Sequence, residues 1–201
     1  MSRILILFAH PVLEKSKVQL ELLNQAKNIP GVTINDLYQN YPDFDIDVAK
    51  EKRSLLDHDI IIWQHPFYWY SAPPLLKQWL DLVLEHGWAY GKRGNALSGK
   101  KVFNVLTSGG GTDAYQYGGY NKYPIHDYLK PFERTAELCR MFYWPPFWVP
   151  GVHRMAPEEV KNYGKQYHNI LMALSTDFLS EEAILSVSYL NELFPITTNQ
   201  V

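Results

Sequence analysis

Short apolar runs separated by segments of helical spacing are the feature that most constrains the fold of this chain. The runs at 4–9 and 60–63 contain no polar residue. A strand covered on one face alternates between apolar and polar residues, so these runs predict strands that are buried on both faces. Five segments are expected to be strands: 4–9, 31–37, 60–63, 101–107 and 141–149. The last contains Pro145 and Pro146, which interrupt it.

Apolar residues recur at helical spacing between these runs, within 16–26, 45–56, 74–85 and 157–174. Asp45 is the candidate N-cap of the second of these helices. Strands that alternate with helices through short links predict a parallel sheet with helices on both faces.

The C-terminal part of the chain is expected to be an addition to this α/β domain. Residues 1–175 are expected to form the domain and 176–201 a helical extension. The extension carries an apolar stripe that is expected to pack on the domain or on a dimer mate, made by Ile184, Val187, Leu190 and Phe194.

Composition limits the classes of function. The 201-residue chain has a formal net charge of −2, which gives no electrostatic reason to expect nucleic acid as a partner. With Cys139 as its one cysteine, neither an intrachain disulfide nor a cysteine-based metal site is expected. The run at 4–9 is too short for a signal peptide, and no segment approaches the ~20 apolar residues that cross a bilayer. A cytoplasmic protein without a metal is therefore expected.

Three segments that follow predicted strands carry residues suited to ligand binding. They read HPVLEKSKVQ after the first strand, QHPFYWYSAPP after the third and TSGGGTDAY after the fourth. In parallel sheets, ligands bind outside the carboxyl ends of the strands, at the point where the strand order reverses. With the strand order 2-1-3-4-5, the three segments converge on one crevice.

The first segment has two interpretations. Ser16 followed by Gln19 is a capping box, which needs nothing more than the start of a helix. The free N–H groups and the positive end of the same helix also suit a phosphate, with His10 and Lys17 available to help. No G-x-G-x-x-G motif is present, which disfavours a dinucleotide held in the Rossmann manner.

The other two segments also have more than one interpretation when each is taken alone. The glycines at 109–111 suit a flexible turn, or a row of backbone N–H groups that approach a ligand closely. The rings at 67–70 suit a core, an oligomer interface, or a wall that is apolar on its face and wet at its edge. A planar ligand that carries a phosphate needs all three segments at once, and riboflavin phosphate fits that description.

Four stretches resemble the flavodoxin-like NAD(P)H:quinone oxidoreductase family: ILILFAHP, SLLDHDIIIWQHPFYWYSAPPLLKQWLDLVLEHGWAYG, LSGKKVFNVLTSGGG and WPPF. Within the family they most resemble the bacterial ancillary subunits of glutathione-regulated potassium-efflux (Kef) systems. The resemblance spans residues 3–175. It implies a flavodoxin-like α/β fold, with a five-stranded parallel sheet of order 2-1-3-4-5 and helices on both faces.

The resemblance also implies roles for individual residues. It assigns cofactor binding to three loops: His10, Ser16 and Lys17 at the ribityl phosphate, Pro66, Phe67, Tyr68 and Trp69 under the isoalloxazine ring, and Thr107, Ser108, Gly109 and Gly110 at the pyrimidine edge of the ring. Trp88 and Tyr90, in HGWAYG, match a loop that in family dimers reaches the other subunit's substrate pocket. Tyr115 matches a tyrosine that assists hydride transfer in the animal members.

Two positions depart from the family pattern. Gln19 stands where the family often has an asparagine, which is one methylene shorter. Asn121 falls near a histidine that accompanies the catalytic tyrosine in animal members, and His126 lies five residues further on. The second departure bears on whether Tyr115 has a histidine partner.

The function implied by the resemblance is two-electron transfer from NAD(P)H through FMN to a quinone, in a homodimer, with FAD as the alternative cofactor. One alternative is a regulatory subunit of a membrane potassium-efflux protein, held peripherally at the inner membrane, with secondary reductase activity. Another is a flavodoxin-type electron carrier. Such carriers tend to be strongly acidic, whereas this chain is nearly neutral.

Overall fold

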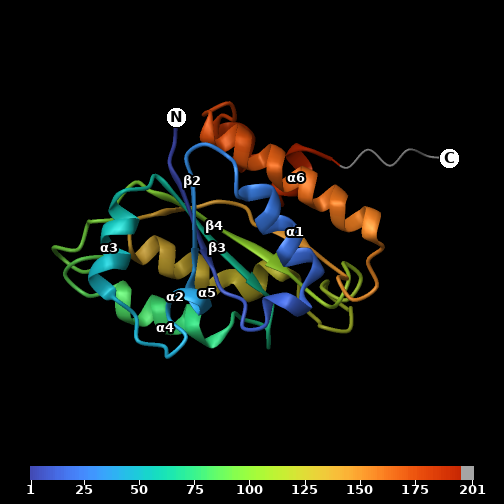
Figure 1. The fold of residues 1–201 in the computed structure, drawn as a ribbon, viewed down its shortest axis with the longest axis horizontal. Coiled ribbons are helices and arrows are strands. Elements are labelled where there is room, and N and C mark those ends of the chain that lie inside the picture. The colour runs from blue at the N-terminus through green and yellow to red at the C-terminus, as the bar shows by residue number, and fades with distance from the viewer. Residues whose placement is uncertain (196–201) are drawn as a thin grey trace.

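The sheet is parallel and has the strand order expected from the sequence. The computed structural model describes residues 1–195, and within them the order is β2-β1-β3-β4-β5, with β6 also paired to β4 (Figure 1). Every pairing is parallel. This confirms the predicted flavodoxin-like topology. The strands are β1 (Ile4–Phe8), β2 (Val32–Asp36), β3 (Ile60–Pro66), β4 (Lys101–Thr107), β5 (Phe142–Tyr143) and β6 (Phe147–Val149).

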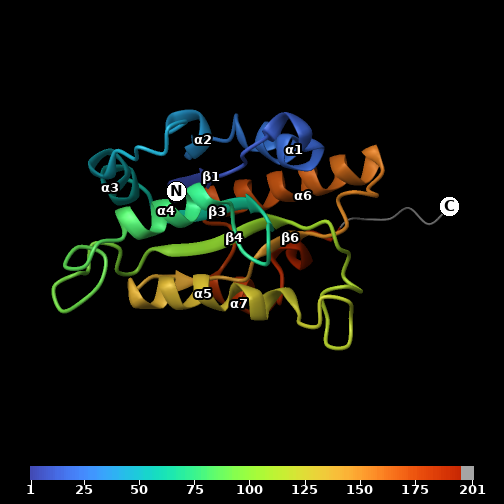
Figure 2. The ribbon, with the colours of Figure 1, turned by 90° about the horizontal axis from the view of Figure 1, so that it is seen from below.

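Helices cover both faces of the sheet (Figures 1 and 2). They are α1 (Lys17–Ala26), α2 (Leu37–Asn40), α3 (Val48–Leu56), α4 (Pro74–Val83), α5 (Ile125–Leu138), α6 (Pro157–Ser175) and α7 (Glu181–Leu185), with 3-10 turns η1 (Leu13–Lys15) and η2 (Leu190–Leu193). One core layer contains α1 and α6, which pack side by side, and the other contains α3, α4 and α5. None of the helices within residues 1–195 is long and apolar enough to cross a bilayer.

The strand β1 explains why both layers have an apolar core. Its five residues are fully buried. Leu5 and Leu7 belong to the layer of α3, α4 and α5, whereas Ile4, Ile6 and Phe8 belong to the layer of α1 and α6. Because successive side chains of a strand point to opposite faces, an unbroken apolar run supplies both layers at once.

Two elements differ from the sequence-based expectations. The fifth strand is divided into β5 and β6 at Pro145 and Pro146, because proline has no N–H group to donate to the ladder. The cap of α3 is Asp47, whose carboxylate accepts a hydrogen bond from the Lys50 N–H at 2.9 Å. The prediction of Asp45 as this cap was therefore wrong by two residues.

The segment after α6 contacts the layer that contains α1 and α6. The residues of its expected apolar stripe are buried or partly buried: Ile184, Val187, Leu190 and Phe194. Trp148, at the sheet edge, donates a hydrogen bond from its backbone N–H to Asn191 Oδ1 at 2.9 Å. The rest of the expected extension, 196–201, lies outside the described residues. The division of the chain at residue 175 and packing on a dimer mate stay predictions.

Candidate functional site

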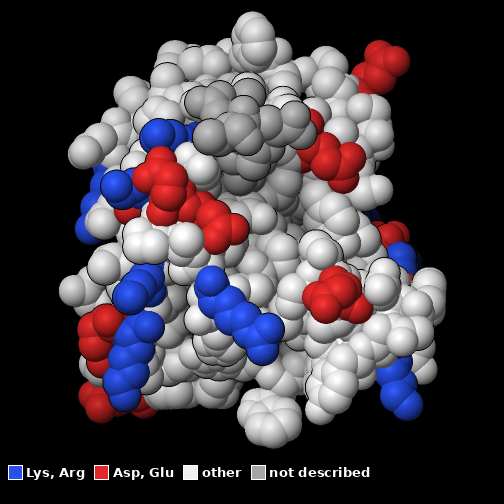
Figure 3. Space-filling view, turned by 90° about the vertical axis from the view of Figure 1, so that its right-hand side faces the viewer, with Lys and Arg blue, Asp and Glu red and all other residues white. Residues whose placement is uncertain are grey.

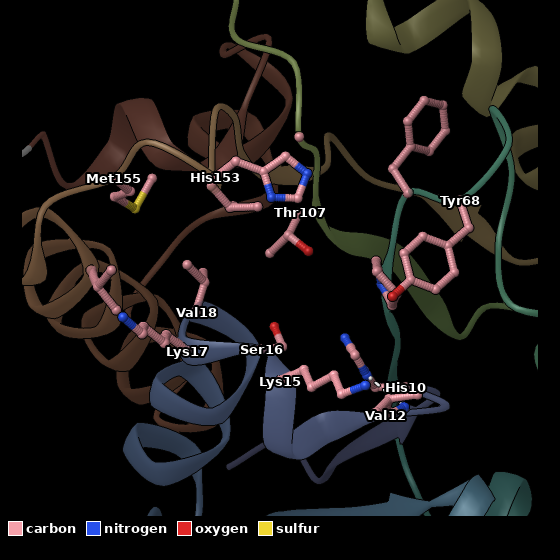
Figure 4. A pocket seen from close by; sticks show the side chains of 15 residues that line it. His10, Val12, Lys15, Ser16, Lys17, Val18, Tyr68, Thr107, His153 and Met155 are labelled. Carbon is pink, nitrogen blue, oxygen red and sulfur yellow. Dashed lines mark hydrogen bonds between the residues drawn. The ribbon is translucent and has the colours of Figure 1, made fainter.

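A cleft of about 560 Å³ opens at the carboxyl ends of β1, β3 and β4 (Figure 4). It is lined by His10, Val12, Lys15, Ser16, Lys17, Val18, Pro66, Phe67, Tyr68, Thr107, Gly109, Val152, His153, Met155 and Val160. The three loops singled out in the sequence therefore meet in one crevice. A fourth segment, which contains His153 and precedes α6, was not predicted.

The N-terminus of α1 forms one end of the cleft. Ser16 caps this helix, and its Oγ accepts a hydrogen bond from the Gln19 N–H at 3.3 Å. Within residues 1–195 the N–H groups of Lys17 and Val18 donate to no protein acceptor. Free N–H groups at the positive end of a helix favour an anion. On the face that Figure 3 shows, Lys and Arg side chains lie mainly on the left half, with Asp and Glu side chains among them.

His10 places a neutral donor on the floor of the cleft. The Val12 N–H donates to His10 Nδ1 at 3.1 Å, so the ring proton is on Nε2, which points into the cleft in Figure 4. Burial lowers the pKa of His10 and so keeps its ring uncharged at neutral pH. Lys15, which was not predicted, extends toward His10, whereas Lys17 extends toward the opposite side (Figure 4). An anion at this end of the cleft therefore meets donors from two sides.

The loop after β3 supplies an aromatic wall. Phe67 is buried and packs edge-on against Tyr115 and Tyr128, with ring centroids 5.7 Å apart in both pairs. Tyr68 is exposed and lines the cleft. Trp69 is 93% exposed and does not line the cleft of its own chain. The predicted ring cluster is therefore part core and part surface.

The backbone of this loop is strained. Trp69 and Tyr70 have φ angles of 49° and 62°, a region that bulky residues rarely adopt and that costs about 1–3 kcal/mol per residue. The Ser71 N–H donates to the Tyr68 carbonyl at 2.9 Å and closes the turn. Strained backbone of this kind concentrates at ligand sites. Its position beside the cleft agrees with a binding role for the loop.

The loop after β4 presents a row of free N–H groups. Within the described part of the chain, the N–H groups of Gly109 and Gly110 have no protein acceptor. Ser108 holds the loop from behind, since its Oγ accepts from Trp148 Nε1 at 2.9 Å and donates to the Gly110 carbonyl at 2.8 Å. The Gly151 N–H donates to the same carbonyl at 3.0 Å. Ser108 and Gly110 thus shape the loop, and the free N–H groups remain available to a ligand.

Side chains crowd the two glycines of this loop, so a larger residue at either position would have to move a neighbour. A Cβ at Gly109 would lie 2.6 Å from His153 Nε2, and a Cβ at Gly110 would lie 3.0 Å from Tyr115 Cε2. Both distances are shorter than ordinary contacts. Because Gly109 and Gly110 have no side chains, His153 and Tyr115 can lie close to their backbones.

Tyr115 has a buried ring and an accessible hydroxyl. Its ring packs edge-on against Phe67, Tyr128 and Trp148, with centroids 5.7, 6.1 and 5.8 Å away. Within residues 1–195 its hydroxyl makes no hydrogen bond. It is not one of the buried polar atoms that lack a partner, so the hydroxyl oxygen is accessible. Burial raises the pKa of Tyr115, so the phenol stays protonated and able to donate. The catalytic role of Tyr115 stays a prediction.

No histidine contacts the Tyr115 ring among the aromatic pairs of residues 1–195. Asn121, near which the resemblance implies a histidine in animal members, accepts a hydrogen bond from the Tyr70 hydroxyl at 3.4 Å. His126 packs against the ring of Tyr189, with centroids 4.6 Å apart. The rings that pack on Tyr115 are those of Phe67, Tyr128 and Trp148, so none of them is a histidine that could exchange a proton with its hydroxyl.

Trp88 and Tyr90 lie away from the cleft of their own chain. Their loop joins α4 to the start of β4, so it lies at the amino end of the sheet, whereas the cleft is at the carboxyl end. The Gly87 N–H donates to the Tyr90 carbonyl at 2.8 Å, and Lys52 Nζ lies 4.8 Å from the Trp88 ring centroid. These rings can serve a cleft only in another subunit, and that role stays a prediction.

A helix N-terminus with free N–H groups, an aromatic wall and free backbone donors at the switch point of a 2-1-3-4-5 sheet are typical of a flavodoxin-like protein. A family model described as "Flavodoxin-like fold" matches residues 2–171, and the chain belongs to that family.

Relatives and solved structures agree with this assignment. The chain is 46% identical over 165 residues to the glutathione-regulated potassium-efflux system ancillary protein KefG of Serratia proteamaculans, covering 82% of this chain and 90% of KefG. It is similar to general stress protein 14 of Treponema denticola, solved in complex with FMN (TM-score 0.82, 38% identity, covering 86% and 99% of the two chains). It is also similar to an NADPH-quinone reductase of P. pentosaceus (TM-score 0.76, 34% identity, covering 83% and 96%).

Proposed function

We propose that the protein is an FMN-dependent oxidoreductase that transfers two electrons from NAD(P)H to a quinone. The observation that carries the proposal is the convergence of an anion-binding helix end, an aromatic wall and free backbone N–H groups on one cleft. A planar cofactor with a terminal phosphate needs all three. The FMN complex of general stress protein 14 and the reductase of P. pentosaceus, each similar over most of this chain, support the proposal.

The residues of the cleft fit FMN. Lys17 and Val18 offer free N–H groups to the phosphate, with Ser16 and Lys15 beside them. Phe67 and Tyr68 offer apolar surface to the ring, and the N–H groups of Gly109 and Gly110 offer donors to its polar edge. FAD is the alternative cofactor, but the sequence has no obvious additional segment for its adenine.

Bound FMN would supply the redox chemistry, by accepting a hydride from NAD(P)H and passing two electrons to the acceptor. The overall reaction balances as NAD(P)H, a proton and a quinone giving NAD(P)⁺ and a hydroquinone. The protein contributes orientation and fixed dipoles. The N–H groups of Gly109 and Gly110 have no protein acceptor, so they could stabilise the negative charge that a bound ring gains. The open side of the cleft beside Tyr68 would admit NAD(P)H first and the quinone after it leaves.

The active form is proposed to be a homodimer in which each subunit completes the other's pocket. Trp88 and Tyr90 are large rings on a loop that cannot reach the cleft of its own chain. Trp88→Ala should weaken quinone turnover more than FMN affinity. A fully active species that light scattering identifies as a monomer would contradict the shared pocket.

The direct test is NAD(P)H oxidation with a simple benzoquinone by protein loaded with FMN. Turnover should require FMN and quinone together, and one hydroquinone should form for each NAD(P)H consumed. Protein loaded with riboflavin in place of FMN is the matched control for the phosphate. Bound FMN that NADH and NADPH both fail to reduce would contradict the oxidoreductase.

A second candidate is a regulatory subunit of a membrane potassium-efflux protein, held peripherally at the cytoplasmic side of the inner membrane. The 46% identity to KefG favours it. Both roles share one flavin site, so activity alone does not separate them. Membrane fractionation with and without a co-expressed efflux protein does: a regulatory subunit should sediment with membranes only when the efflux protein is present. The electron-carrier alternative stays the weakest, given the net charge of −2.

A further inference from the structure

A buried chain of hydrogen bonds connects α6 to the cleft. The Tyr167 hydroxyl donates to Gln64 Oε1 at 2.9 Å, and Gln64 Nε2 donates to Gln19 Oε1 at 2.9 Å. Gln19 Nε2 then donates to Thr107 Oγ1 at 3.2 Å. The first three side chains are fully buried, and Thr107 is nearly so while still lining the cleft. The chain thus runs from α6 through β3 and α1 to Thr107 at the ligand site.

The direction of these bonds follows from the two ends of the chain. If every bond were reversed, the Tyr167 hydroxyl would accept and its own proton would need another acceptor. Tyr167 is fully buried, and within residues 1–195 its hydroxyl has no partner except Gln64. A buried hydroxyl proton without an acceptor is costly. The proton of the Thr107 hydroxyl needs no protein acceptor, because Thr107 lines the cleft and a ligand or water can accept the proton there. The chain therefore starts at Tyr167 and ends at Thr107.

This direction determines what Thr107 presents to a ligand. One lone pair of its hydroxyl is occupied by Gln19 Nε2. Its own proton has no acceptor among the hydrogen bonds of the described residues, so it is available on the cleft side. A hydroxyl free of such a partner could equally turn and accept. Because the Gln19 amide donates to Thr107, it leaves the Thr107 proton for the cleft, whereas a reversed amide would take that proton and leave Thr107 only as an acceptor.

We propose that Gln19 is a positioning residue that holds the Thr107 hydroxyl as a hydrogen-bond donor to bound flavin and thereby raises the flavin's reduction potential. The inference rests on the proposed function. A donor stabilises an acceptor more strongly once the acceptor carries negative charge, as a reduced ring does. Gln64 and Tyr167 act behind Gln19 by setting the direction of its amide.

The test is the midpoint potential of bound FMN in four variants. Thr107→Val removes the donor and should weaken binding of reduced FMN roughly tenfold more than that of oxidised FMN, which for a two-electron couple lowers the potential by about 30 mV. Thr107→Ser keeps the hydroxyl and should stay near wild type. Gln19→Met and Tyr167→Phe leave Thr107 in place but release its orientation, so each should shift the potential in the same direction by a smaller amount.

Double variants separate positioning from a structural effect. In the Thr107→Val background, Gln19→Met and Tyr167→Phe should cause no further shift, because the group they orient is gone. Shifts that add in the double variants, or wild-type potentials in both single variants, would overturn the inference. Tyr167→Phe carries the test if Gln19→Met does not fold, since it removes one oxygen from a residue that does not line the cleft. A wild-type protein that binds no FMN would instead overturn the proposed function, and titration detects this before any variant is made.

Discussion

His153 lies so close to Gly109 that a methyl group on Gly109 would come within 2.6 Å of His153 Nε2. The two residues come from different loops, one after β4 and one before α6. Hydrogen bonds join these loops: the Val152 N–H donates to the Ser108 carbonyl at 3.1 Å, and the Ser108 N–H donates to the Val149 carbonyl at 3.0 Å. The cleft wall is therefore a composite of both loops.

Gly109→Ala should weaken FMN binding roughly tenfold, a change of about 1.4 kcal/mol. The added methyl group displaces the exposed His153 side chain, and the displaced ring takes up space in the cleft. His153→Ala alone should change affinity little, and the double variant should recover most of the loss. Fluorescence titration measures all three. A double variant as weak as Gly109→Ala would show that His153 is not the cause.

Two substitutions at Ser16 separate its structural role from its proposed ligand role. Ser16→Asp keeps a good N-cap and adds a negative charge at the helix end, so the free energy of unfolding should change little while FMN binding falls. Ser16→Ala removes the cap and should cost about 1 kcal/mol of stability. Riboflavin, which has no phosphate, is the control ligand for Ser16→Asp. Equal losses for FMN and riboflavin would place the phosphate elsewhere.

Tyr115→Phe should slow reduction of bound FMN by NAD(P)H roughly ten- to a hundredfold, the range of ~1.4–2.7 kcal/mol for one lost donor. The substitution keeps the buried ring and removes only the accessible hydroxyl. Stopped-flow reduction at saturating NAD(P)H measures the rate. An unchanged rate would leave Tyr115 as part of the wall.

Acid should destabilise the protein through His65. Burial lowers the pKa of His65 to about 4, whereas an unfolded histidine titrates near 6.5. The unfolded chain thus binds this proton first, so the stabilisation is present above pH 6.5 and is lost as the pH falls toward 4. Between pH 7 and pH 5 the loss is about 2 kcal/mol.

Urea unfolding at several pH values checks the His65 prediction. His65→Gln should reduce the slope of stability against pH without abolishing it, because burial also lowers the pKa values of His10 and His126. His58→Gln is a matched control that leaves His65 in place. A wild-type slope in His65→Gln would contradict the prediction.

The strands were predictable because local patterns determine them, whereas their order followed from the resemblance to the flavodoxin-like family. An unbroken apolar run supplies both core layers, as β1 does. The helix α5 was missed, although Ile125, Leu129, Phe132 and Ala136 form its buried stripe at helical spacing. Pro131 lies inside that helix and obscured the pattern.

The parts of the cleft that depend on distant contacts were not predictable. His153 follows no motif, and it reaches the site only through hydrogen bonds between two loops. The bond between Tyr167 and Gln64 joins residues 103 positions apart. Local spacing identified Gln19 as part of a helix cap, but only the folded chain directs its side chain at Thr107.

Titration of the purified, flavin-free protein with FMN and with riboflavin, followed by quenching of flavin fluorescence, tests the central claim most directly. The account predicts one FMN bound per chain and riboflavin at least roughly tenfold weaker, since it cannot use the helix end at Ser16. Failure to bind either flavin would contradict the account.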